Sequence, residues 1–64
     1  MTSLEQVERW KQASDRRKFW SVPGKSSWIA TIEDETGKRH TSSAKTLERA
    51  CSLLLAIMNR KGLV

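Results

Sequence analysis

The chain has 64 residues, of which 12 are Lys or Arg and 7 are Asp or Glu, so its formal net charge at pH 7 is +5. A chain this short is expected to form one domain, residues 1–64, with a small core. Its single cysteine excludes a disulfide framework and suits a reducing compartment. The N-terminus carries charges where a signal peptide needs an apolar core, and the longest apolar run, 53–58, is too short to span a bilayer. We therefore expect a cytoplasmic protein without a membrane segment.

The N-terminal segment, residues 3–17, is predicted to be a helix. A capping box can begin at Thr2, paired with Glu5, or one residue later at Ser3, paired with Gln6. The basic triplet 16–18 is expected at its end, where positive charge suits the helix dipole. The apolar residues recur at a spacing of three: Leu4, Val7 and Trp10. So narrow a stripe is not stable alone, and the helix must pack on the rest of the domain or on a partner.

The middle of the chain, residues 18–43, is predicted to form a three-stranded antiparallel sheet. Its first strand contains Phe19 and Trp20 and stops at the turn residues 23–24. Neighbouring residues of a strand point to opposite faces, so one of these aromatic side chains is buried and the other is not. The sequence leaves open which one. An exposed aromatic side chain could stack on bases or anchor a protein contact, and the alternative is that it packs under the first helix.

The second strand alternates, with Trp28, Ala30 and Ile32 expected on the buried face. A hairpin turn follows at 34–37, in which Gly37 can adopt a positive φ. Residues 38–43 then return as a polar strand, which we expect at the edge of the sheet.

The C-terminal segment, residues 46–61, is predicted to be an amphipathic helix. Thr46 is the expected N-cap, with Ser43 as the alternative, and Gly62 is placed to end the helix. Its apolar stripe follows helical spacing: Leu47, Ala50, Cys51, Leu54, Leu55 and Met58. The predicted fold class is therefore α+β with the order α-β-β-β-α, a three-stranded antiparallel sheet packed on the C-terminal helix and an additional N-terminal helix.

The sequence offers little for catalysis. His40 is the only histidine, and Cys51, the only thiol, lies on the apolar stripe, where a cysteine usually serves as a small hydrophobic residue. Nucleophilic catalysis needs a base beside the nucleophile, and a zinc site needs three or four ligands. The acidic run 33–35 contains the predicted turn, so we interpret it as a solvated hairpin. We expect a binding protein, not an enzyme, with no metal and no cofactor.

Residues 28–39 and 46–50 carry a family resemblance. The pattern aromatic-x-Ala-x-Ile-x-Asp, a Gly-Lys-Arg hairpin and Thr-x-Glu-x-Ala at the start of the helix resembles the DNA-binding domain of plant ethylene-response factors and the arm-binding domain of phage integrases. The resemblance covers about residues 19–58 and implies a sheet that lies in the DNA major groove. The positions that match the family's DNA-reading residues include one basic residue, Lys25, and otherwise Ser21, Pro23, Ile29, Thr31 and Glu33.

The predicted order also resembles the double-stranded-RNA-binding domain, first helix included. That resemblance implies a surface made by the first helix, the loop between the first two strands and basic residues at the start of the last helix. Lys45 and Arg49 match the last of these. We rank this resemblance second.

These observations favour a small nucleic-acid-binding protein, DNA before RNA, as an accessory or regulatory factor of a phage or other mobile element. Six basic residues are expected to bind phosphates: Arg16, Arg17, Lys18, Lys25, Lys38 and Arg39. Three further side chains are expected to contact bases: Trp20, Thr31 and Thr41. The clusters 16–18 and 38–39 could converge at one edge of the sheet.

The alternative is a small inhibitor or adaptor that acts on a larger (host) protein. It would use the edge strand 38–43, the first helix or exposed aromatic side chains, Trp10 and Trp20. Self-association to a homodimer through the first helix is compatible with either function. Basic residues on one continuous face would favour nucleic acid, whereas an apolar patch around Trp10 or Trp20 would favour protein.

Overall fold

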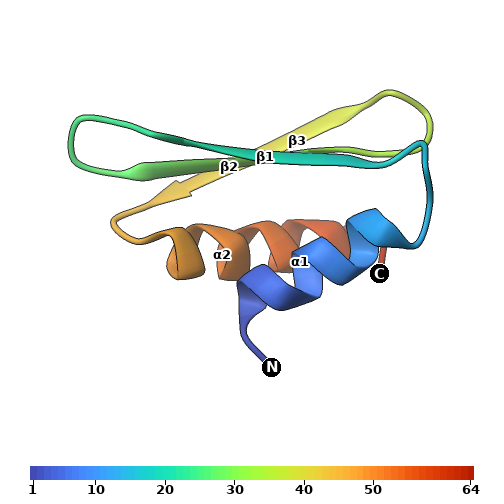
Figure 1. The fold of residues 1–64 in the computed structure, drawn as a ribbon, viewed down its shortest axis with the longest axis horizontal. Coiled ribbons are helices and arrows are strands. Elements are labelled where there is room, and N and C mark those ends of the chain that lie inside the picture. The colour runs from blue at the N-terminus through green and yellow to red at the C-terminus, as the bar shows by residue number, and fades with distance from the viewer.

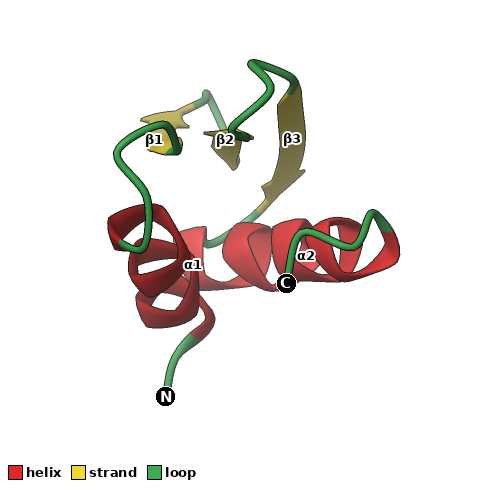
Figure 2. Cartoon of the chain, turned by 90° about the vertical axis from the view of Figure 1, so that its right-hand side faces the viewer, coloured by secondary structure: helices red, strands yellow, loops and turns green.

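The computed structural model describes residues 1–64, and it contains two helices and three strands. They follow the order α1 (Ser3–Gln12), β1 (Lys18–Pro23), β2 (Trp28–Glu33), β3 (Arg39–Ala44) and α2 (Leu47–Arg60). The sheet forms one layer and both helices form the other, on the same side of the sheet (Figures 1 and 2). This architecture confirms the predicted α+β class, the α-β-β-β-α order and the packing of the sheet on the C-terminal helix.

The sheet is antiparallel with the order β1-β2-β3, so its second strand is central and both others are edges. Side chains of one face form rows across the three strands. The rows that face the helices are Phe19–Ile32–His40, Ser21–Ala30–Ser42 and Pro23–Trp28–Ala44. The rows of the opposite, uncovered face are Lys18–Glu33–Arg39, Trp20–Thr31–Thr41 and Val22–Ile29–Ser43. We call this second face the open face.

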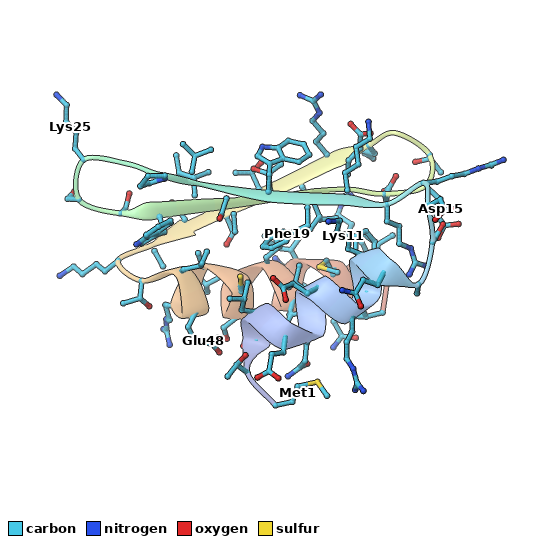
Figure 3. All side chains as sticks on the ribbon, viewed as in Figure 1. Met1, Lys11, Asp15, Phe19, Lys25 and Glu48 are labelled. Atoms are coloured by element: carbon cyan, nitrogen blue, oxygen red, sulfur yellow. The ribbon has the colours of Figure 1, made fainter.

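The register decides between the two neighbouring aromatic side chains of β1. Phe19 pairs with the fully buried Ile32 and lies between the sheet and the helices (Figure 3). Trp20 therefore points to the open face, because neighbouring residues of a strand alternate. The same alternation places Ser21 and Pro23 on the helix side, so the expectation that these two residues belong to the DNA-reading face is wrong.

One buried cluster holds the two layers together. Its eight members come from three of the five elements, α1, β2 and α2: Val7, Trp10, Ala30, Ile32, Ala50, Cys51, Leu54 and Met58. The predicted stripe of the C-terminal helix is confirmed, since four of its residues are in this cluster and Leu47 and Leu55 pack against it. Neither helix is both long and apolar enough to cross a membrane.

The first helix is shorter than the predicted segment 3–17, because it ends at Gln12 with Ala13 as its C-cap. Trp10 is the last apolar residue of the stripe, and Ser14 then favours a turn over a further helical turn. The Ser14 hydroxyl accepts a hydrogen bond from the Arg16 backbone N–H (3.3 Å), and its carbonyl accepts one from that of Arg17 (3.2 Å). The basic triplet therefore lies outside the helix, and its predicted interaction with the helix dipole is wrong.

Contacts distant in sequence fix the helices at both ends. At the start of α1, Thr2 and Glu5 form the predicted capping box. Glu48, in the first turn of α2, also accepts hydrogen bonds there from the backbone N–H groups of Ser3 (2.7 Å) and Leu4 (3.1 Å). These bonds lower the pKa of Glu48.

At the other end, the indole N–H of Trp10 donates to the carbonyl of Leu63 (2.9 Å). That carbonyl is in place because α2 ends where predicted. Gly62 adopts φ 74°, and the Leu63 N–H donates to the carbonyl of Met58 (2.8 Å). The two helices are thus tied together at their starts and at their ends.

The core predicts a contrast between two adjacent leucines of α2. Leu54 is fully buried, whereas Leu53 is 41% exposed. We expect Leu54→Ala to lower the free energy of unfolding by about 2–5 kcal/mol, a large share of the stability of so small a domain. Leu53→Ala should change it by less than about 1 kcal/mol. Urea titrations followed by circular dichroism would measure both, and equal losses would contradict the assigned core.

Candidate functional site

The candidate site is the open face, because no helix or loop covers it (Figures 1 and 2). The molecule has no pocket, and the site is a surface of three rows across three strands. The chemistry changes from row to row. The first row is charged, the second contains Trp20, and the third is largely apolar.

In the charged row, two cations share one carboxylate. Glu33 on the central strand lies 3.2 Å from the Nε of Arg39 and 3.8 Å from the Nζ of Lys18, measured to its carboxylate oxygens. Its side chain is mostly covered, whereas both cations are well exposed. The row therefore carries one excess positive charge, with its negative group recessed between the two positive ones.

In the middle row, Trp20 is 36% exposed, and the guanidinium carbon of Arg39 lies 5.4 Å from the centre of its ring. Thr31, its neighbour on the central strand, is only 8% exposed although it points to this face. The hydroxyls of Thr31 and Thr41 lie 3.2 Å apart and form a hydrogen bond. Thr31 is thus covered by its neighbours on this face. Of the three side chains expected to contact bases, only Trp20 and Thr41 are accessible.

The third row holds two apolar side chains, Val22, which the sequence did not indicate, and Ile29, which it indicated only as a position matching the family's DNA-reading residues. Val22 is 49% exposed and Ile29, opposite it, is 37% exposed. With Trp20 they form an apolar patch on β1 and β2. The signal that could have identified Val22 is its position two residues after Trp20, which places both side chains on one face once the direction of Trp20 is known.

Asp34 organises the β2–β3 hairpin at the charged end of the face. Its Oδ1 accepts hydrogen bonds from the Thr36 hydroxyl (2.6 Å), the Thr36 N–H (3.0 Å) and the Lys38 N–H (3.1 Å). Its Oδ2 lies 3.1 Å from the Nε2 of His40, and both side chains are nearly buried. The bonds from Thr36, His40 and Lys38 hold the pKa of Asp34 well below its ordinary range. Gly37 closes the turn with φ 87°.

The two basic clusters meet at this end of the sheet, although on its two opposite edge strands and not at one edge. The pairing of Lys18 with Glu33, and of Glu33 with Arg39, brings the α1–β1 connection beside the β2–β3 hairpin. Arg17, however, makes contacts within the protein and is not free to bind a phosphate. It pairs with Glu35 (2.7 Å), donates to the carbonyl of Trp10 (3.0 Å) and lies over the Trp10 ring (4.6 Å). Arg16 and Lys38 are exposed and form no ion pair.

Lys25 lies at the opposite end of the sheet, at the tip of the β1–β2 loop (Figure 3). The row Pro23–Trp28–Ala44 ends the strands there, so this loop is near Lys45 and the start of α2. A six-residue strand separates the two ends by about 17 Å. Lys25 therefore belongs with Lys45 and not with the cations around Glu33.

Trp10 and Cys51 are both buried. Trp10, offered as a protein-binding anchor, is only 7% exposed and is covered by Arg17, so its ring is not available on the surface. Cys51 is fully buried, and burial raises the pKa of its thiol. No cluster of three or more His, Cys, Asp or Glu side chains able to hold a metal ion is present.

No family model, no curated protein and no solved structure matches this chain.

The network around Asp34 predicts a pH dependence of stability. The folded chain favours the ionised carboxylate, so its contribution is complete above the pKa of the unfolded chain, about 3.9, and is lost as the pH falls through the lower folded-state pKa. Urea titrations should therefore give a free energy of unfolding that falls below about pH 4. In Asp34→Asn the protein should be less stable at pH 7, and the fall on acidification should be shallower. Part of the fall will remain, because Glu48 and Glu5 also have lowered pKa values.

The matched control for this variant is Asp15→Asn. Asp15 is exposed, and its carboxylate is in no ion pair. This control should keep both the stability and the pH dependence of the unsubstituted protein. An Asp34→Asn variant with the full acid sensitivity would contradict the role given to this carboxylate.

Proposed function

We propose that this protein binds nucleic acid, DNA before RNA, on the open face of its sheet. The observation that carries the proposal is the position of Trp20. More than a third of this side chain is exposed on an uncovered face, one row away from Lys18 and Arg39. An aromatic ring that stacks on bases beside cations that neutralise phosphates is the usual combination in such sites.

The electrostatics of the charged row support this proposal. Ion pairs on a protein surface contribute little stability, so Lys18 and Arg39 can exchange Glu33 for a phosphate at small cost. Glu33 itself lies between both cations, and their two positive charges offset its repulsion of a phosphate. Arg16 and Lys38 stand at the same end without an acidic partner and add positive charge around the row.

The wider biological assignment rests on general properties of the chain. Its net charge of +5 supports a polyanionic partner, and we propose an accessory or regulatory factor of a phage or other mobile element that acts as a binding protein and not as an enzyme. A free, buried Cys51 supports residence in the reducing cytoplasm.

The salt dependence of binding tests this proposal. A fluorescently labelled DNA oligonucleotide should bind more weakly as salt rises, because bound cations release counterions from phosphates. Lys18→Gln should weaken binding and reduce the slope of log affinity against log salt by roughly 0.7 for a single strand and 0.9 for a duplex. Glu33→Gln should strengthen binding, because it removes the negative charge between the two cations.

The matched control is Lys61→Gln, which removes the same charge beyond the end of α2, in the helix layer. It should leave the slope unchanged. If Lys18→Gln and Lys61→Gln weaken binding equally, the open face is not the binding surface. If no oligonucleotide binds even at low salt, the proposed function is wrong.

A second candidate function, protein binding, is favoured by one observation, the apolar patch of Trp20, Val22 and Ile29. Exposed apolar groups beside an aromatic side chain are typical of protein interfaces. The double variant Val22→Thr, Ile29→Thr keeps β-branched residues in the strands while removing apolar surface. A protein partner recovered after nuclease treatment should be lost from this variant in a pull-down. If the partner is retained, the patch does not bind it.

A further inference from the structure

We infer that the open face binds a single strand of nucleic acid, with a base stacked on Trp20 and the adjoining phosphate between Lys18 and Arg39. This inference rests on the proposed function and specifies the form of its ligand. It also departs from both family resemblances, which imply a duplex. Three features of the open face support it.

The first feature is the small number of polar groups that could contact base edges. Reading a duplex in the major groove requires donors and acceptors that meet the edges of the bases. The open face carries Trp20 and Val22 on β1 and Ile29 on the central strand, and Thr31 beside them is nearly buried with its hydroxyl already bonded to Thr41. The accessible polar groups are at the rim. A face of this kind can meet the flat surfaces of bases better than their edges.

The second feature is the exposed ring of Trp20. Bases inside a duplex are stacked on both sides, so an aromatic side chain reaches a base face only where the strand is unpaired or at its end. The Trp20 ring has Arg39 at 5.4 Å and Val22 two residues along the same strand. The guanidinium of Arg39 therefore lies over the ring, and apolar side chains occupy the next row of the face.

The third feature is the spacing of the rows. Successive residues on one face of a strand are about 6.6 Å apart. The row of Trp20 is directly next to the charged row, so this is the spacing between their backbone positions. A base and the phosphate of its own nucleotide can occupy these two rows together. The next base then lies over Val22 and Ile29, which accept any base because they offer no directional hydrogen bonds.

The remaining basic residues do not provide this arrangement. Lys25 and Lys45 lie about 17 Å away at the other end of the strands, and Arg49 is in the first turn of α2. They could hold a duplex backbone, but such binding would not involve Trp20. A dependence on Trp20 therefore distinguishes the two modes.

The test compares the affinity of the protein for a DNA oligonucleotide of about ten nucleotides, as a single strand and annealed to its complement. Both affinities are measured by fluorescence anisotropy at the same low salt. Two substitutions separate stacking from apolar packing. Trp20→Phe keeps an aromatic ring, whereas Trp20→Leu keeps apolar volume without one. Urea titrations of both variants check that they fold. Quenching of tryptophan fluorescence provides an independent readout, because Trp10 is buried and Trp28 faces the helices.

We expect the single strand to bind more tightly than the duplex by roughly 5- to 150-fold, the value of one stacked base. Trp20→Leu should abolish most of this difference, while Trp20→Phe should retain it. Quenching by the single strand should occur in the unsubstituted protein and disappear in both variants.

Two results would overturn the inference while leaving the proposed function in place. One is a duplex that binds as tightly as the single strand. The other is a folded Trp20→Leu protein with undiminished single-strand affinity. If neither the single strand nor the duplex binds, the inference and the proposed function are both wrong. Protein binding then remains as the function of the apolar patch.

Discussion

The buried cluster between sheet and helices is the constraint on which the rest of the structure depends. Ile32 at the centre of the sheet and Leu54 and Met58 of α2 are fully buried within it. A chain of 64 residues has too few apolar side chains for a second core, so both helices cover the same face of the sheet. The other face is then left uncovered as a direct result of the packing, and Trp20, Val22 and Ile29 are exposed there.

An uncovered sheet face would ordinarily be polar, because apolar side chains in water contribute nothing to folding. Here the polarity is graded along the strands instead. The end next to the β2–β3 hairpin carries Lys18, Glu33 and Arg39, whereas the end next to the β1–β2 loop carries Val22 and Ile29. Trp20 stands at the boundary. A ligand matched to this face needs a charged part and a flat apolar part close together, as a nucleotide has.

Local periodicity in the sequence was sufficient to predict most of the fold. The i, i+3, i+4 stripe from Leu47 to Met58, the alternation of Trp28, Ala30 and Ile32, and the caps at Thr2 and Thr46 are each local signals, and each is confirmed. The predictions that failed depended on other information. The end of α1 is set by the turn at Ser14, whose hydroxyl accepts a hydrogen bond from the Arg16 N–H.

The candidate site was predicted less completely, for a related reason. Alternation shows that Phe19 and Trp20 face opposite ways, but both choices fit the sequence equally well. Only the pairing of Phe19 with buried Ile32, a contact between two strands, selects one. Once Trp20 is known to be exposed, Val22 follows. The bonds from Glu48 to the start of α1 and from Trp10 to Leu63 join distant parts of the chain and leave no local pattern.

Arg17 shows how the structure changes the interpretation of a charge cluster. In the sequence, residues 16–18 are three equivalent cations. In the structure Arg17 joins α1 to the hairpin through Trp10 and Glu35, Lys18 belongs to the open face, and Arg16 is free in solvent. The hairpin that Arg17 holds is the one that Asp34 organises, and it leads directly into Arg39. Arg17, which contributes least charge to the surface, thus helps to position the cation nearest to Trp20. Its removal would disturb the proposed binding through the geometry of the open face and not through the loss of a phosphate contact.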